Sequence, residues 1–238
     1  MVLVSKSARH SRRIAHLNRD RDRNRLRSSV DYVLERMESR TLLAATPIVS
    51  GQTIAGSLTH AGQQDTYTFT ATAGKTFDVS VGDASAASGV HPYLQVFAPG
   101  GARVINNATS ATSTSVDGVI TVPSTGAGTY TIDVQDFLGN GTGAYDVELA
   151  VAPSTQATDS NGDGGVIKSG QTKAGTINRF GDIDVFTFSA SAGNTFDISL
   201  GDATSGSSVR PYLQVFNPSG TRVINNATSA TATSVDGI

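Results

Sequence analysis

The stretch DTYTFTATAGKTFDVSV (65–81) decides the fold class of this chain. Within it Tyr67, Phe69 and Ala71 alternate with threonines, so apolar side chains fall on one face of an extended segment and hydroxyls on the other. An Ala-Gly pair at 73–74 supplies a turn, and the same alternation returns after it. The stretch therefore predicts two consecutive, half-buried β-strands.

Composition extends this prediction to the whole fold. Charged residues make up 16% of the chain and aromatic residues 6%, which favours short strands and tight turns over long helices. We predict an all-β fold of two packed sheets, a jelly-roll-like or Greek-key β-sandwich, with the strand order left open by the spacing. The expected strands of the first half are 52–59, 65–72, 75–82, 91–98, 102–107, 114–122, 127–135 and 143–151.

The chain contains an internal repeat. SGQTIAG (50–56) matches SGQTKAG (169–175), and the match continues without a gap at an offset of 119 residues, with 45 identities over 70 aligned positions. A repeat of this length has the size of a domain rather than of a solenoid unit. We therefore predict tandem sandwich domains that fold separately.

The repeat divides the chain into four predicted parts. These are a basic leader or targeting segment at 1–45, a first β-sandwich repeat at 46–151, a linker at 152–168 and a second repeat at 169–238. The second repeat has no counterpart of 120–151, so we expect it to be truncated. Its core would then be partly uncovered, and it would show no cooperative melting on its own.

The leader differs in charge from the rest of the chain. Residues 1–45 carry 11 Lys and Arg against 5 Asp and Glu, whereas 46–238 carry 7 against 15. Apolar spacing predicts a short helix within 28–45, so the segment is expected to be partly helical or disordered. The Arg-rich run 19–27 suits phosphate contacts, but its acidic residues and its lack of aromatic residues favour targeting over nucleic-acid binding. No apolar run is long enough to span a membrane.

The sequence offers little catalytic chemistry. It contains no cysteine, no Gly-x-Ser-x-Gly elbow and no His-Glu-x-x-His motif. His60 and His91 of the first repeat become Arg179 and Arg210 in the second, so no histidine is common to both. We expect a protein that is not an enzyme.

One pair of carboxylates recurs in both repeats, as Asp78 with Asp83 and as Asp197 with Asp202. Paired carboxylates can perform acid–base catalysis. Because Asp78 alternates outward from its strand and Asp83 follows a glycine in an expected turn, solvated surface explains both better.

A calcium site is the sharper metal hypothesis. DSNGDG (159–164) places Asp159, Asn161 and Asp163 at alternate positions before a glycine, as the first half of an EF-hand-type loop does. The twelfth position, Gly170, is not the usual glutamate, so the loop is incomplete unless Asp182 or Asp184 contributes a ligand. An ordinary flexible spacer is the alternative.

Three stretches carry a resemblance to a known family: GQQDTYTFTATAGKTFDVSV (62–81), PYLQVFAPGG (92–101) and GTYTIDVQDFLGNGTGAYDVELAV (128–151). They resemble the bacterial pre-peptidase C-terminal domain, which is similar in fold to the collagen-binding domains of clostridial collagenases. The residues that carry the likeness are core and turn positions, so the resemblance implies a fold more than an activity. They are Asp65, Tyr67, Phe69, Ala73, Gly74, Leu94, Val96, Gly128, Tyr130, Gly143 and Tyr145.

LERMESRTLLAA (34–45) resembles the box that follows a basic leader in many planctomycete surface proteins, through Glu38, Arg40, Leu42 and Leu43. A proline beside the arginine is missing here. The resemblance implies export.

Together these features predict a non-catalytic structural or binding module of a larger bacterial protein, located outside the cell or at its surface. Its expected partners are an extracellular polysaccharide or a protein polymer, and calcium is the one expected ion. The alternative is a pair of accessory domains of a secreted peptidase or other hydrolase whose catalytic domain lies outside 1–238.

Overall fold

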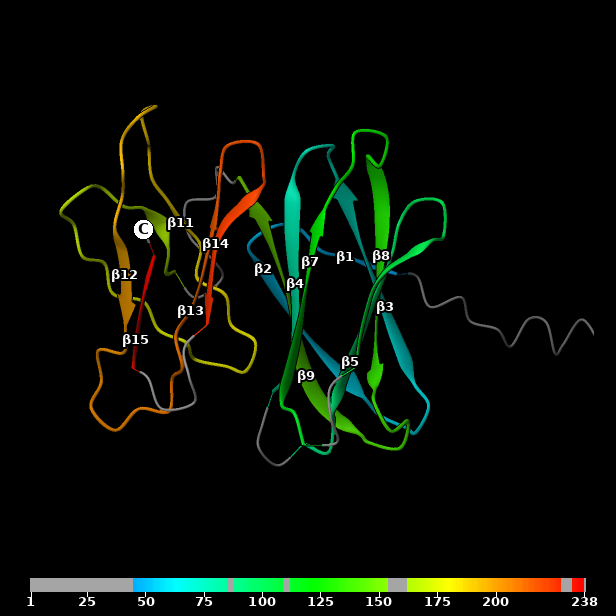
Figure 1. The fold of residues 1–238 in the computed structure, drawn as a ribbon. Coiled ribbons are helices and arrows are strands. Elements are labelled where there is room, and N and C mark those ends of the chain that lie inside the picture. Colours follow the sequence, from blue (N-terminus) through cyan, green and yellow to red (C-terminus); the bar gives the residue numbers. More distant parts are fainter. Residues whose placement is uncertain (1–44, 85–87, 109–111, 154–161, 228–232, 238) are drawn as a thin grey trace, which may run out of the picture. The chain divides into compact units, whose positions relative to one another are not determined.

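The computed structural model describes residues 45–84, 88–108, 112–153, 162–227 and 233–237. These residues form strands, turns and loops, and none of them is helical, so the fold is all-β as predicted (Figure 1). The expected leader helix and the planctomycete-like box lie outside the described residues. No helix capable of crossing a membrane is found in the described parts of the chain.

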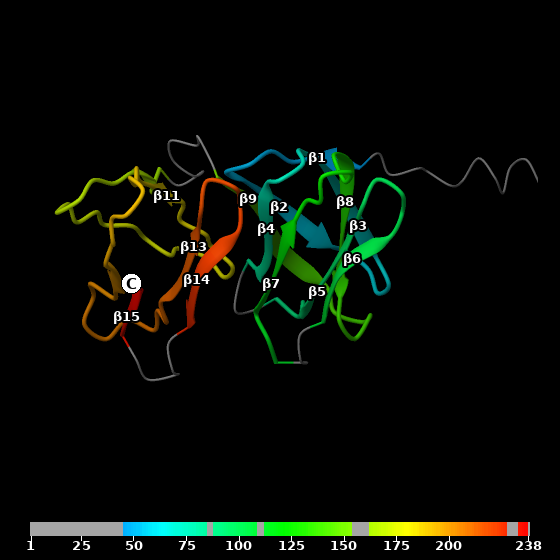
Figure 2. The ribbon, with the colours of Figure 1, turned by 45° about the horizontal axis from the view of Figure 1, so that its top comes forward.

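The first repeat folds as a β-sandwich of two sheets that face one another (Figures 1 and 2). One sheet has the strand order β1-β3-β8-β5-β6 and the other has β2-β9-β4-β7. All pairings are antiparallel except that of β1 with β3, which is parallel. The strands are β1 (Thr46–Pro47), β2 (Gln52–Leu58), β3 (Gln64–Ala71), β4 (Thr76–Asp83), β5 (Pro92–Phe97), β6 (Arg103–Ala108), β7 (Ser115–Thr121), β8 (Gly128–Asp136) and β9 (Gly143–Ala152).

The alternation seen in the sequence is what builds the core. Tyr67, Phe69 and Ala71 of β3 are buried and face the opposite sheet, while the threonines between them turn outward. The ring of Phe69 stacks on Tyr130 at 5.4 Å between centroids and lies 4.9 Å from the ring of Phe77. These aromatic residues join β3 and β8 of one sheet to β4 of the other.

Strands β8 and β9 each join the strands of their own sheet, because each is hydrogen-bonded on both of its sides. β8 pairs with β3 and β5, and β9 pairs with β2 and β4. Both strands come last in the repeat. Each sheet is therefore completed only by the C-terminal part of the repeat.

The second repeat keeps the same local pairings at the 119-residue offset. Gly165–Val166 pairs in parallel with Phe186–Thr187, as Thr46–Pro47 pairs with Tyr67–Thr68 in the first repeat. Gly165–Val166 lies inside the segment predicted as a linker, so the repeated structure begins before residue 169. The strands are β10 (Gly165–Val166), β11 (Phe186–Thr187), β12 (Ile198–Gly201), β13 (Tyr212–Phe216), β14 (Arg222–Ala227) and β15 (Ser234–Gly237).

The second repeat is less buried than the first. Phe188 is 38% exposed whereas its counterpart Phe69 is 3% exposed, and Leu200 is 36% exposed where Val81 is fully covered. Within 162–237, no described strand occupies the place of β8 or β9, and the remaining strands form separate two-stranded sheets.

Candidate functional site

The residues that carry the family resemblance meet in a buried hydrogen-bonded chain. The hydroxyl of Tyr67 lies 2.7 Å from that of Tyr145, and Tyr145 donates to Asp65 Oδ2 at 2.7 Å. Tyr145 has one hydroxyl proton and donates it to the Asp65 carboxylate. The hydroxyl of Tyr67 is therefore the donor in the bond between the two tyrosines. Tyr145 has no exposed surface, and its ring meets that of Tyr67 edge-on at 6.5 Å.

Gln63 extends this chain to the turn between β2 and β3. Its amide nitrogen donates to Asp65 Oδ1 at 2.7 Å and to the carbonyl of Ser57 at 3.0 Å. Its amide oxygen accepts from the backbone N–H of Thr59 at 2.7 Å and from the hydroxyl of the same residue at 2.9 Å. The turn is thereby fixed to the core.

The surroundings of the two tyrosines favour their neutral form. Burial raises the pKa of both Tyr67 and Tyr145 above the ordinary value, and the nearby carboxylate of Asp65 raises both further. Both phenols stay neutral at physiological pH. The chain of hydrogen bonds joins β3 of one sheet to β9 of the other.

Asp136 organises the neighbouring loops. Its Oδ1 accepts the backbone N–H of His91 at 2.8 Å, and its Oδ2 accepts those of Asn140 at 3.1 Å and Gly141 at 2.9 Å. Burial alone would raise the pKa of Asp136, but these three hydrogen bonds outweigh it and hold the pKa below its ordinary value. The Asp136 carboxylate therefore stabilises the loops before β5 and after β8 by accepting their backbone N–H groups.

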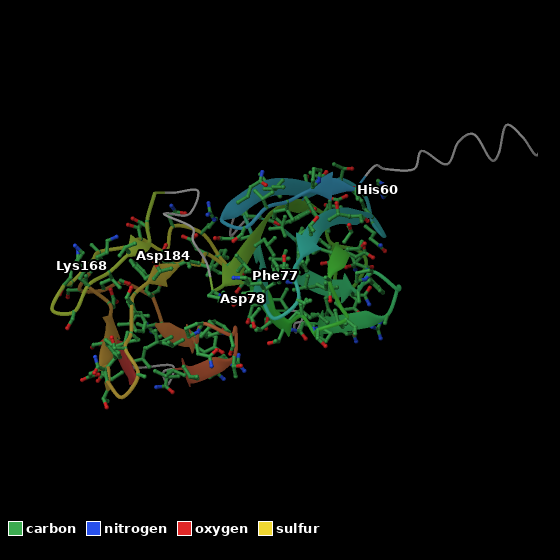
Figure 3. The ribbon with its side chains drawn as sticks, turned by 90° about the horizontal axis from the view of Figure 1, so that it is seen from above. His60, Phe77, Asp78, Lys168 and Asp184 are labelled. Carbon is green, nitrogen blue, oxygen red and sulfur yellow. The ribbon has the colours of Figure 1, made fainter. Side chains whose placement is uncertain are left out.

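The expectation that Asp78 and Asp83 are both solvated is wrong for Asp83, which is 4% exposed at the end of β4. Residues five apart in a strand point to opposite faces, so the two carboxylates cannot act as a pair. Phe77 turns into the space between the sheets and Asp78 away from it (Figure 3). Asp78 is itself largely buried, and burial first, then the charge of Asp117, raises its pKa to about 7 against the opposing effect of Arg222.

The predicted calcium ligands are only partly within the described structure. Asp159 and Asn161 lie outside the described residues. Asp163 Oδ2 accepts the backbone N–H of Thr176 at 2.7 Å. The described residues bring no three His, Cys, Asp or Glu side chains together as a metal site. The calcium hypothesis remains a prediction.

The sheet surface of β3, β8, β5 and β6 carries an array of polar side chains that sequence reasoning missed. Tyr93 donates to Asn106 Oδ1 at 2.7 Å, and Gln95 Nε2 lies within 3.1 Å of both the Tyr93 hydroxyl and Asn106 Oδ1. Gln135 donates to Gln95 Oε1 at 3.2 Å. We call Tyr93, Gln95, Asn106 and Gln135 the amide face.

The tyrosine–asparagine pair of the amide face recurs in the second repeat. Tyr212 donates to Asn225 Oδ1 at 2.6 Å, at positions equivalent to Tyr93 and Asn106. The stretch PYLQVF held the signal for this surface, because its Leu and Val face the core and its Tyr and Gln therefore face outward. Amide and hydroxyl groups beside an aromatic ring suit a neutral, hydrogen-bonding ligand.

The comparisons agree with the resemblance over part of the chain. Residues 63–136, from the end of the turn before β3 to the end of β8, match the bacterial pre-peptidase C-terminal domain. No curated protein matches the chain.

Two solved structures show similarity to parts of the chain. The pre-peptidase C-terminal domain of a collagenase from Bacillus anthracis is 20% identical, with 44% of this chain and 93% of that domain covered and a TM-score of 0.35. PliG, a periplasmic inhibitor of g-type lysozyme from Aeromonas hydrophila, is also 20% identical, with 45% and 95% covered and a TM-score of 0.34.

Proposed function

We propose that this chain is a non-catalytic extracellular module of a larger bacterial surface or secreted protein, and that its repeats present the amide face to a polymer. The observation that carries this proposal is the hydrogen-bonded array of Tyr93, Gln95 and Asn106, whose tyrosine–asparagine pair returns in the second repeat. The buried chain from Tyr67 to Asp65 supports a structural role for the motif residues, which leaves the surface as the place for binding.

The chemistry of the amide face favours a polysaccharide or the backbone of a protein polymer as the ligand. Sugar hydroxyls and peptide groups exchange hydrogen bonds with amides, and the ring of Tyr93 offers an apolar surface to a sugar or a proline ring. A single face of this kind binds weakly. Tandem repeats raise the apparent affinity for a polymer because the second contact becomes intramolecular.

The binding experiment uses the full chain and three insoluble polymers: cellulose, chitin and fibrillar collagen. We expect retention on one of them that falls at least tenfold in the double variant Tyr93→Ala with Tyr212→Ala. Asn140→Ala is the matched control, since it removes an exposed amide from a turn outside the amide face. Retention that is equal in all three proteins would reject the amide face as the site.

A second candidate function is that of accessory domains in a secreted peptidase or other hydrolase. The match of residues 63–136 to the pre-peptidase C-terminal domain favours it. The reading frame of the parent gene discriminates between the two. A peptidase domain in that frame supports the accessory role, whereas further repeats of the 119-residue unit support a structural array.

A further inference from the structure

The outward surface of the four-stranded sheet in the first repeat is acidic. Asp146 and Glu148 of β9 alternate with core residues and face outward, as do Asp78 of β4 and Asp117 of β7. Ser80 lies between two of them, opposite Glu148 on one side and opposite Asp117 on the other. We call Asp78, Asp117, Asp146 and Glu148 the acidic face.

Glu148 is only 3% exposed although it lies on this outward surface. Groups of the second repeat surround it. Arg179 Nη2 lies 3.5 Å from Glu148 Oε2, and the backbone N–H of Ile183 donates to the same oxygen at 3.4 Å. A carboxylate at such depth requires a compensating charge and hydrogen-bond donors, and the second repeat supplies both.

Arg179 is itself held in place by two further groups. It donates to the hydroxyl of Thr53 at 2.7 Å, and Thr53 is the cross-strand neighbour of Glu148 between β2 and β9. On its own side of the contact, Arg179 lies 3.1 Å from Asp182 Oδ1. The guanidinium therefore bridges a carboxylate of each repeat, a geometry that its fork of donors allows.

The sequence of the turn differs between the repeats at the residues that make this contact. HAGQQ (60–64) in the first repeat becomes RFGDI (179–183) in the second, so only the glycine is kept in a repeat that is otherwise mostly identical. In the first repeat, Gln63 fixes its own turn through Asp65 and Thr59. In the second, the equivalent Asp182 accepts the backbone N–H of Asn178 at 2.9 Å, as Gln63 accepts that of Thr59, and it also pairs with Arg179.

We propose that the acidic face of the first repeat is a docking surface for the turn 179–183 of the second repeat, with Arg179 as the central contact. The two repeats are then held in one preferred relative orientation and do not reorient independently. This inference does not depend on what the amide face binds, because it concerns the opposite sheet.

The test measures the distance between the repeats in the full chain. The chain has no cysteine, so one spin label can be placed in each repeat of the same chain, at Thr129→Cys and Ser205→Cys, both exposed positions. We expect one narrow distance distribution by pulsed electron spin resonance. Arg179→His, which restores the residue of the first repeat, should remove the narrow peak and leave a broad distribution.

Arg210→His is the matched control, because position 210 also changes from histidine to arginine between the repeats, and the Arg210 guanidinium donates to the carbonyl of the neighbouring Val209 at 3.1 Å. It should keep the narrow peak. Glu148→Arg combined with Arg179→Glu should restore the peak that Arg179→His loses. Two results would overturn the proposal. One is a broad distance distribution in the labelled chain that keeps Arg179, and the other is a narrow distribution that persists in the Arg179→His variant.

Discussion

The hydroxyl of Tyr67 lies 2.7 Å from the hydroxyl of Tyr145, and these two residues belong to different sheets of the sandwich. The bond joins β3 to β9 through the core, where a hydroxyl without a partner would be costly. Each tyrosine gives the other a partner that the apolar core cannot provide.

Tyr67→Phe should destabilise the first repeat by about 1 kcal/mol, because one buried hydrogen bond is lost while Tyr145 keeps Asp65 as its acceptor. The second repeat already has Phe186 at this position. Urea unfolding of the full chain measures the change. Tyr93→Phe, which removes a surface hydroxyl, should have a smaller effect, and an equal loss in both variants would contradict the special role of the buried bond.

Gly56→Ala should cost about 1–3 kcal/mol, since a Cβ there would overlap the ring of Tyr145 and force an overpacked core to shift. Gly100→Ala is the control, because a Cβ at Gly100 meets no atom within 4 Å. Thermal unfolding of the two variants side by side measures the difference. If both melt at the same temperature, the close approach at Gly56 is not a constraint.

Asp136 should make the first repeat sensitive to acid. Its pKa is lowered in the folded state, so its contribution to stability is present above the pKa of the unfolded chain and is lost as the pH falls through the folded-state pKa. Asp136→Asn should therefore be destabilised near neutral pH by about 2 kcal/mol, since an amide cannot accept all three N–H bonds. The difference in urea midpoint between the Asp136→Asn variant and the unmodified chain should become smaller as the pH falls from 6 to 3. A gap that does not change with pH would show that the carboxylate charge plays no part.

Asp78 should act in the opposite direction. Its pKa is raised to about 7, mainly by burial and then by Asp117, with Arg222 opposing, so the folded state holds a proton that the unfolded state releases near pH 4. Stability from this group is greatest below the unfolded value and falls as the pH rises through about 7, by at most about 4 kcal/mol. Asp78→Asn should remove this dependence and be the more stable protein at pH 8.5. If the stability of Asp78→Asn changes with pH in the same way as that of the unmodified chain from pH 5 to 8.5, the raised pKa of Asp78 is wrong.

Calcium binding at the segment between the repeats is tested by calorimetric titration of the full chain. We expect heat of binding below millimolar calcium, and its loss in the double variant Asp159→Ala with Asp163→Ala. Asp133→Asn, in the middle of β8, serves as a control with an unchanged titration. No heat at millimolar calcium in the unmodified chain would eliminate the site.

Most of the first repeat was predictable from its sequence because its strands alternate cleanly. The eight expected strands correspond to β2 through β9 with ends that agree within one residue. β1 was not predicted, since a two-residue strand containing a proline leaves no periodic signal. The burial of Asp83 was also missed, because a turn glycine before it suggested a loop whereas the strand continues through it.

The site was far less predictable than the fold. Alternation tells which face a side chain takes but not which strand lies beside it, so the partnership of Gln95 with Gln135 required the strand order. The chain from Tyr67 to Asp65 likewise depends on a partner 78 residues away. Chemistry that arises between strands distant in sequence is invisible to local patterns.

The central position of β8 and β9 sets the order in which the protein can be made. A ribosome delivers β2 through β7 before either strand that joins them, so a nascent repeat has two unfinished sheets until its last quarter emerges. Stable tertiary structure of the first repeat is thus postponed until its last two strands have been synthesised.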